Sequence, residues 1–234
     1  MKRITDPTTV TLDERVVPVR LRRNRQARRI VLRIDPDHDG VVVTLPLRTA
    51  AREAMELVVD KKAWVLTRLE RLPSRRPFAC GASIPLLGVD HMIRHRPDAR
   101  GGVWREEGEI HVTGAIEHLP RRVTDWLKSE ARRAIAPKAH GFAAVLGKTV
   151  SRIAVRDTRS RWGSCSHDGN LSFSWRLVMT PESVLDYVVA HEVAHLVHMN
   201  HGKRFWRTVA DLGVDVGHAR AWLNRHGDQL LRYG

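Results

Sequence analysis

The sequence is poor in cysteine and has no long apolar run. Only two cysteines occur among 234 residues, Cys80 and Cys165, which argues against a secreted scaffold held together by disulfides. No stretch approaches the roughly 18 apolar residues that a membrane-spanning helix needs. The first residues also lack the apolar core of a signal peptide. We therefore expect a cytoplasmic protein without a membrane partner.

Acidic residues are also scarce relative to basic ones, and the net charge is +14. The excess is uneven, because eight arginines and no acidic residue lie between Arg15 and Arg33. One interpretation is an anion-binding face for nucleic acid, and the other is a set of ordinary outward-facing strand positions. No RNP sequence or CxxC pair supports the first interpretation. Nucleic acid is therefore a candidate partner of this Arg-rich N-terminal region, and both interpretations stay open.

The pattern of apolar residues predicts an α+β fold in two parts. We expect a small strand-rich subdomain with one helix over residues 1–116 and a catalytic domain over residues 117–234. Residues 17–23 alternate between apolar and basic side chains, which is the period of a half-exposed strand. Residues 27–35 follow after a short turn, so these two segments are expected to form a hairpin. We find no internal repeat in the sequence.

Helices are predicted from apolar spacing and from their start signals. One helix is expected over residues 49–72 in the first part. The second part opens with a helix over residues 119–146, in which Pro137 is expected to introduce a kink or a break. The Thr-Pro-Glu sequence at 180–182 is a strong helix start, with a capping hydroxyl, a proline and an acid in the first turn.

The helix that follows this start carries the motif H-E-x-x-H, with His191, Glu192 and His195. Residues four apart lie one turn apart on the same helical face, so both imidazoles can bind one zinc ion. Glu192 then lies where it can act as a general base toward water. The alternative is a surface helix with scattered histidines. Apolar neighbours such as Val188 and Val193 argue against it, because buried histidines without a metal would be costly polar groups.

A third ligand is needed, and two histidines are candidates. His198 would share the stripe of His195 on an unbroken helix, but it would lie a turn further from the metal. His201 could return to the metal if the chain turned at Asn200, since asparagine tolerates the left-handed conformation that ends helices. Three histidines leave a fourth coordination position open, as catalysis requires. This reasoning favours His201 and keeps His198 as the alternative.

Four segments of the second part resemble the YgjP-like metallopeptidase family. They are R-x-R-W-G-S-C-S at 159–166, L-S-F-S-W-R-L at 171–177, P-x-x-V-x-D-Y-V-V-x-H-E-x-x-H-L at 181–196, and N-H-x-x-x-F-W at 200–206. The family is similar to the SprT-like proteases, which share H-E-x-x-H and a third histidine six residues later. The resemblance implies zinc at His191, His195 and His201, with catalysis by Glu192.

The resemblance also implies a zincin-like catalytic domain, in which the H-E-x-x-H helix packs on a short sheet. A strand edge near the metal would then hold a peptide or protein substrate, and residues 171–175 are our candidate. Arg161 and Tyr187 are candidates for stabilising an oxyanion, and Asp186 for orienting a neighbouring group. The SprT-like relatives act on proteins bound to DNA. A protease that uses its Arg-rich N-terminal region to bind DNA is therefore an alternative function.

Overall fold

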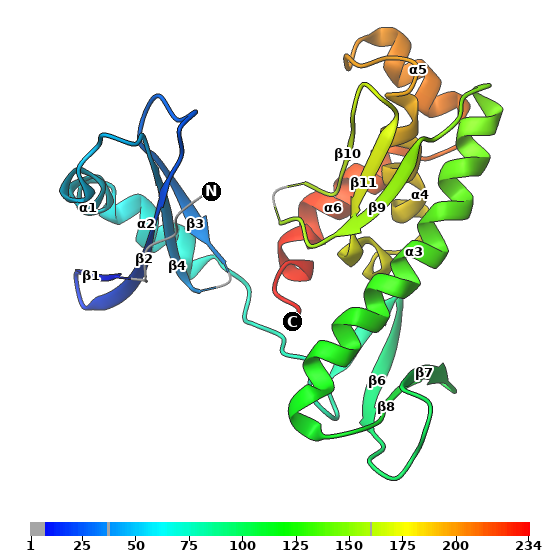
Figure 1. The fold of residues 1–234 in the computed structure, drawn as a ribbon, viewed down its shortest axis with the longest axis horizontal. Coiled ribbons are helices and arrows are strands. Elements are labelled where there is room, and N and C mark those ends of the chain that lie inside the picture. The colour runs from blue at the N-terminus through cyan, green and yellow to red at the C-terminus, as the bar shows by residue number, and fades with distance from the viewer. Residues whose placement is uncertain (1–7, 37, 160) are drawn as a thin grey trace. The chain divides into compact units, whose positions relative to one another are not determined.

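The computed structural model describes residues 8–36, 38–159 and 161–234, and the chain divides into two compact units at residues 74 and 75. The first unit contains one four-stranded sheet in the order β1-β2-β4-β3, followed by two helices (Figure 1). β1 pairs with β2 and β3 with β4 in antiparallel fashion, whereas β2 and β4 are parallel. The elements are β1 (Thr8–Leu12), β2 (Arg15–Arg23), β3 (Val31–Asp35), β4 (Gly40–Leu45), α1 (Ala51–Asp60) and α2 (Lys62–Glu70).

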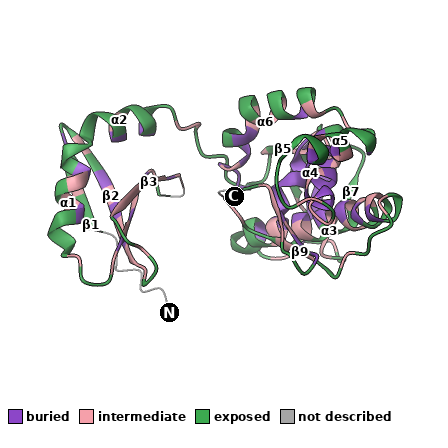
Figure 2. Cartoon of the chain, turned by 90° about the horizontal axis from the view of Figure 1, so that it is seen from above, coloured by how far each residue is buried: buried purple, intermediate pink, exposed green. Residues whose placement is uncertain are grey.

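The core of the first unit lies between one face of this sheet and its two helices. Val19 and Val43 are fully buried on neighbouring strands, and they belong to one cluster with Val58 of α1 and Val65 of α2. Figures 1 and 2 show both helices on the same side of the sheet. The opposite face of the sheet carries no helix of this unit. Its exposed and half-buried side chains alternate with the buried ones along β2 and β4.

The hairpin predicted between residues 17–23 and 27–35 is wrong. β2 pairs with β1 and β4, and β3 lies at the edge of the sheet beyond β4. The observed hairpins form instead at Asp13 and Asp39, which adopt positive φ angles of 52° and 48° in the tight turns. A local turn after β2 does exist, because the backbone N–H of Ala27 donates to the carbonyl of Asn24. That turn leads the chain past β4 rather than back along β2.

A second sheet opens the other unit, and its topology repeats that of the first. The strand order is β5-β6-β8-β7, with antiparallel outer pairs and a parallel central pair. The strands are β5 (Ser83–Leu86), β6 (Val89–His95), β7 (Val103–Glu106) and β8 (Glu109–Val112). The sequence shows no repeat, but the chain forms the same arrangement of strands twice.

A 27-residue helix, α3 (Leu119–Val145), covers this second sheet after a short 3-10 turn at Ile116–His118. Its buried residues recur every four positions, from Leu119 through Leu127 to Ala143. The helix is continuous through Pro137, so the expected break is absent. A proline removes one helical hydrogen bond, and the buried stripe on either side of it keeps the helix in one piece.

The remainder of this unit contains a three-stranded sheet, one 3-10 helix and three α-helices. Its strand order is β10-β11-β9, with β11 between the other two. The elements are β9 (Arg152–Arg156), β10 (Gly163–Cys165), β11 (Asn170–Ser174), a 3-10 helix (Trp175–Met179), α4 (Glu182–Ala194), α5 (Lys203–Asp211) and α6 (Val216–Leu230). Figure 2 shows that buried residues concentrate in α4. Among the described residues, no helix combines the length and apolar character needed to cross a membrane.

The division at residues 74 and 75 differs from the expected boundary after residue 116. Ile84 and Ile110 of the second sheet share one hydrophobic cluster with Leu127 of α3. The backbone N–H of Leu87, in the β5–β6 turn, also donates to the carbonyl of Val178 at 2.7 Å, just before α4. The second sheet therefore belongs with the histidine-bearing helix. A strand-rich composition alone does not reveal which core a sheet joins. The fold class, a mixture of helices and sheets, is as predicted.

Candidate metal centre and active site

Three histidines converge at the C-terminal end of α4. One nitrogen each of His191, His195 and His201 can be chosen so that all three lie within 4.8 Å of one another. The Nε2 atoms of His191 and His201 face each other at 3.0 Å. Imidazole nitrogens directed at one point are suited to sharing a cation. The three histidines that the sequence favours as ligands are therefore close together in the structure.

The route of the chain from His195 to His201 differs from the prediction. α4 ends at Ala194, and tight turns follow, in which the N–H groups of Leu196 and Val197 donate to carbonyls three residues earlier. Asn200 has no positive φ angle, so a left-handed turn at this residue is not what ends the helix. The early end of α4 lets the chain turn back and bring His201 to the other two rings.

His198 contributes its backbone rather than its ring. Its carbonyl oxygen lies 3.0 Å from Nδ1 of His195. A ring nitrogen that donates to a carbonyl leaves the other nitrogen as an acceptor or a metal ligand, so this contact selects the tautomer of His195 that binds a metal through Nε2. The side chain of His198 is not part of the histidine cluster.

Phe205, fully buried on α5, supports all three imidazoles. Its ring centroid lies 4.9 Å from that of His191, 4.6 Å from His195 and 4.7 Å from His201. The ring centroid of Trp206 lies 5.7 Å from that of His191 and 5.8 Å from that of His201. The F-W pair of the last motif therefore fixes the orientation of the three rings. The fixed spacing of this pair from His201 is the signal in the sequence that indicates this role.

Glu192 lies against β10, and a glycine makes room for it. A Cβ atom on Gly163 would lie 2.5 Å from Cγ of Glu192 and 2.6 Å from Oε1. Any larger residue at this position would displace the carboxylate or the strand. The glycine of the W-G-S-C motif is therefore required by the position of Glu192, a role that the local sequence does not indicate.

Burial sets the protonation of these groups. It lowers the pKa of His191 to about 4, assisted by the neighbouring histidines and Arg220. Burial also lowers the pKa of His195, so both rings are neutral and able to bind a metal at neutral pH. It raises the pKa of Glu192 to about 7, with Arg161 opposing the shift. A carboxylate with such a pKa can both accept and release a proton near neutrality.

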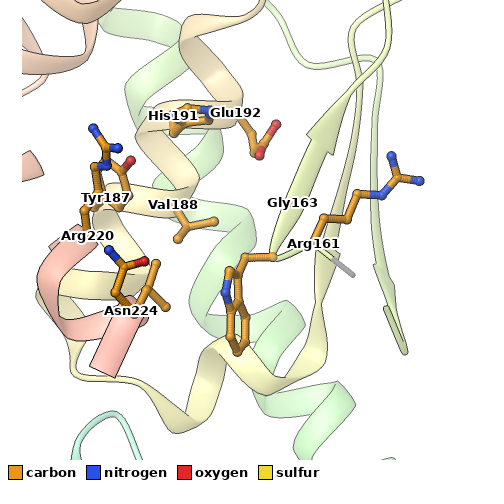
Figure 3. A pocket seen from close by; sticks show the side chains of 10 residues that line it. Arg161, Gly163, Tyr187, Val188, His191, Glu192, Arg220 and Asn224 are labelled. Atoms are coloured by element: carbon orange, nitrogen blue, oxygen red, sulfur yellow. The ribbon is translucent and has the colours of Figure 1, made fainter. Parts of the chain in front are cut away.

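A cavity of about 300 Å³ opens beside Glu192 and His191. Tyr187 and Arg220 lie on one side of it, whereas Gly163 and Arg161 lie on the other, with the side chain of Arg161 directed outward (Figure 3). Burial raises the pKa of Tyr187, so its hydroxyl stays protonated at neutral pH. Both residues that sequence analysis named for an oxyanion therefore line the cavity.

The structure also decides two expectations about the surroundings of the site, and the first of them is wrong. β11, within the segment 171–175 proposed to hold substrate, pairs with β9 on one side and β10 on the other, so its edges are already used. β10 is the edge strand beside Glu192. Asp186 was expected to orient a neighbouring group or a ligand ring; it forms an ion pair with Lys138 of α3 at 2.7 Å, so its neighbour is a lysine and not a histidine. Neither outcome could be read from local patterns, because both depend on long-range pairing.

The helix with its H-E-x-x-H motif, the third histidine and the adjoining cavity define the class of metal-dependent hydrolases. The family model of the YgjP-like metallopeptidase domain matches residues 28–226, and the chain belongs to this family. The resemblance noted from the motifs is thereby confirmed, and the family implies a divalent metal ion. No curated protein matches the chain. A similar solved structure is the metallopeptidase zymogen abylysin of Pyrococcus abyssi, with 20% identity and a TM-score of 0.36, covering 42% of this chain and 97% of that chain.

Proposed function

We propose that the chain is a zinc-dependent peptidase in which His191, His195 and His201 hold the metal and Glu192 is the general base. The observation that carries the proposal is the meeting of three imidazole nitrogens within 4.8 Å beside a buried carboxylate. Three imidazoles suit zinc and leave a coordination position open. The donor set fits the ion, since the histidines are oriented by Phe205 and by the carbonyl of His198. The site belongs to a zincin-like domain in this proposal.

A bound zinc ion would supply Lewis acidity toward a water molecule and toward the carbonyl group of the scissile bond. Glu192 takes the proton of the attacking water and passes it to the nitrogen of the leaving amine as the C–N bond breaks. Tyr187, protonated and facing the cavity, donates a hydrogen bond to the developing oxyanion. The edge strand β10 offers its backbone to an extended peptide.

The proposal is tested with zinc analysis and peptide turnover on the full chain. Glu192→Gln is expected to keep zinc and to lose peptidase activity by about a hundredfold or more. His201→Ala is expected to lose zinc, and His198→Ala is the matched control that keeps it, since the backbone carbonyl at that position remains. Zinc loss in His198→Ala without loss in His201→Ala would overturn the ligand assignment. Unchanged turnover in Glu192→Gln would overturn the role of the base.

A second candidate function is nucleic-acid binding by the first unit, and one observation favours it. The register places Arg20, Arg22 and Arg33 on the sheet face that α1 and α2 do not cover. Arg20 already contacts Asp35 at 3.5 Å. The exposed arginines of the segment after β2 add to this charge; they are Arg25, Arg28 and Arg29. A basic open sheet of this kind suits phosphate groups, and the two functions combine in a protease that acts on DNA-bound proteins.

DNA binding to the full chain, measured over a range of salt concentrations, tests this second function. We expect log affinity to fall with log salt by about 0.9 per phosphate contacted. The triple substitution Arg28→Ala, Arg29→Ala and Arg33→Ala should weaken binding and reduce that slope. Arg52→Ala is the control, because Arg52 lies on α1 in an ion pair with Glu56. A flat salt response would remove this function from consideration.

A further inference from the structure

The lining of the cavity beside Glu192 combines apolar and basic side chains. Trp162, Val188 and Leu223 form apolar parts of its lining, from three separate segments of the chain. Arg220 and Asn224 lie one turn apart on α6 and both line the cavity, where Figure 3 shows them on the same wall. A lining of this composition suits a side chain with an apolar stem and a polar end.

Arg220 is available to a ligand. It is exposed, and it forms no ion pair with a carboxylate of the described residues. Its guanidinium carbon lies 5.6 Å from the centroid of the Trp206 ring, which holds the side chain near the histidines. Its guanidinium charge is close enough to act on both Tyr187 and His191. Glu192 is the one carboxylate among the described residues that line this cavity.

The basic character continues beyond the first cavity. A neighbouring hollow of about 370 Å³ shares Arg161, Trp162 and Leu223 with it and adds Arg159, so a groove follows α6 away from Glu192. Asp228 is the one acidic residue of its described lining. Along both hollows the arginines outnumber the carboxylates. Arg159 is already paired with Asp157 at 3.8 Å, so Arg220 and Arg161 are the arginines that would attract an acidic side chain of a peptide here.

We propose that Arg220 determines specificity, selecting peptides with a glutamate or aspartate next to the scissile bond, and that the groove along α6 receives acidic substrates. This inference rests on the proposed peptidase function and names its substrate class. The carboxylate of the substrate would pair with the guanidinium of Arg220, and the methylene groups would lie against Val188 and Leu223. Arg161, with its outward side chain, would contribute charge rather than a direct contact.

Two sets of peptides test the proposal with the zinc-loaded full chain. Each pair differs only by glutamate or glutamine on one side of the scissile bond. We expect the glutamate peptide of one pair to have a kcat/KM about tenfold higher, mostly through KM. Arg220→Gln should remove this preference, and Arg220→Glu should invert it toward a lysine peptide. Arg225→Gln is the matched control, since Arg225 is exposed on the same helix but does not line the cavity.

The inference and the peptidase function fail in different ways. Equal turnover of glutamate and glutamine peptides would overturn the specificity and leave the peptidase intact. A uniform loss in Arg220→Gln, with the preference retained, would also overturn it. Absence of turnover for every peptide would count against the peptidase alone. In that case, binding of the same pairs to Glu192→Gln decides the specificity: tighter binding of the glutamate peptide supports it, and equal binding overturns it.

Discussion

The two four-stranded sheets of this chain have the same strand order and the same pairing directions, but they serve different cores. The first sheet closes against α1 and α2 and forms a unit of its own. The second sheet shares its core with α3, and α3 also packs against α4 and β9. One arrangement of strands is therefore used once as an independent unit and once as part of the structure that supports the histidines.

The exposed faces of the two sheets differ in charge as well. On the second sheet Arg94 is neutralised by Glu109 at 2.7 Å, and His111 stacks on Trp104 at 4.9 Å between ring centroids. On the first sheet Arg33 is exposed and forms no ion pair with the described residues. On this face of the second sheet the arginine of β6 is paired, whereas on the first sheet Arg20 is paired with Asp35 and Arg33 is not. This contrast is the structural reason to place the second candidate function on the first unit.

The largest effect is expected from matched core substitutions, which test whether the two units unfold independently. Leu127 on α3 and Leu45 on β4 are both fully buried. Each change to alanine should cost about 2–5 kcal/mol of unfolding free energy in its own unit. We expect Leu127→Ala to lower the temperature at which zinc is released on heating, and Leu45→Ala to leave that temperature unchanged. A metal-sensitive dye measures the release, and circular dichroism follows unfolding.

Equal shifts of zinc release in both variants would show that the two units unfold together. The separation into self-contained cores would then be wrong. Because the two leucines are chemically identical and equally buried, a difference between the variants is attributable to the unit in which each one lies.

Substitution of one glycine in each unit should separate an effect on activity from an effect on stability. A Cβ atom on Gly163 would collide with the Glu192 side chain at 2.5 Å, and one on Gly40 would lie 2.2 Å from the backbone oxygen of Pro18. Gly163→Ala should therefore reduce kcat by about a hundredfold with zinc retained, because the carboxylate is displaced. Gly40→Ala should destabilise the first unit by about 1–3 kcal/mol without changing turnover. Full activity in Gly163→Ala would contradict the placement of Glu192 against β10.

Much of the site could be predicted from the sequence because its signals are local. The start of α4 follows from Pro181 and Glu182, and the four-residue spacing of His191 and His195 follows from helix geometry. The expected capping by Thr180 is wrong, because its hydroxyl donates to the carbonyl of Leu177 instead. His201 was identified among the candidates, although the expected left-handed conformation of Asn200 is not observed. The roles of Gly163 and Phe205 were missed, since each is defined by what a distant segment places against it.

The organisation of strands could not be predicted for the same physical reason. Alternation of apolar residues identifies a strand and its buried face, but it does not name the partner. Residues 17–23 formed a strand as expected and yet paired with β4 rather than with the next strand. The observed boundary lies after residue 74 and not after residue 116, because Ile84 and Ile110 share the core of α3.

The smallest expected effect concerns an ion pair of the second unit in which the arginine is buried and the carboxylate is half exposed. Arg176 is almost fully buried, and it contacts the more exposed Asp157. Burial raises the pKa of Asp157, but the hydrogen bond and charge of Arg176, with Arg159, lower it more, so its pKa lies below the ordinary value. A carboxyl whose pKa is lowered by folding adds stability above its unfolded pKa and loses it as pH falls through the folded pKa.

Asp157→Asn should therefore reduce the free energy of unfolding at neutral pH by about 1 kcal/mol and lower the Tm accordingly. The effect is small because solvent screens this half-exposed group. The difference from the unsubstituted chain should vanish in acid, and Arg52→Ala, at an exposed pair of the first unit, should change the Tm little at any pH. A difference that persisted below the folded pKa would mean that Asp157 stabilises the chain by packing instead of charge.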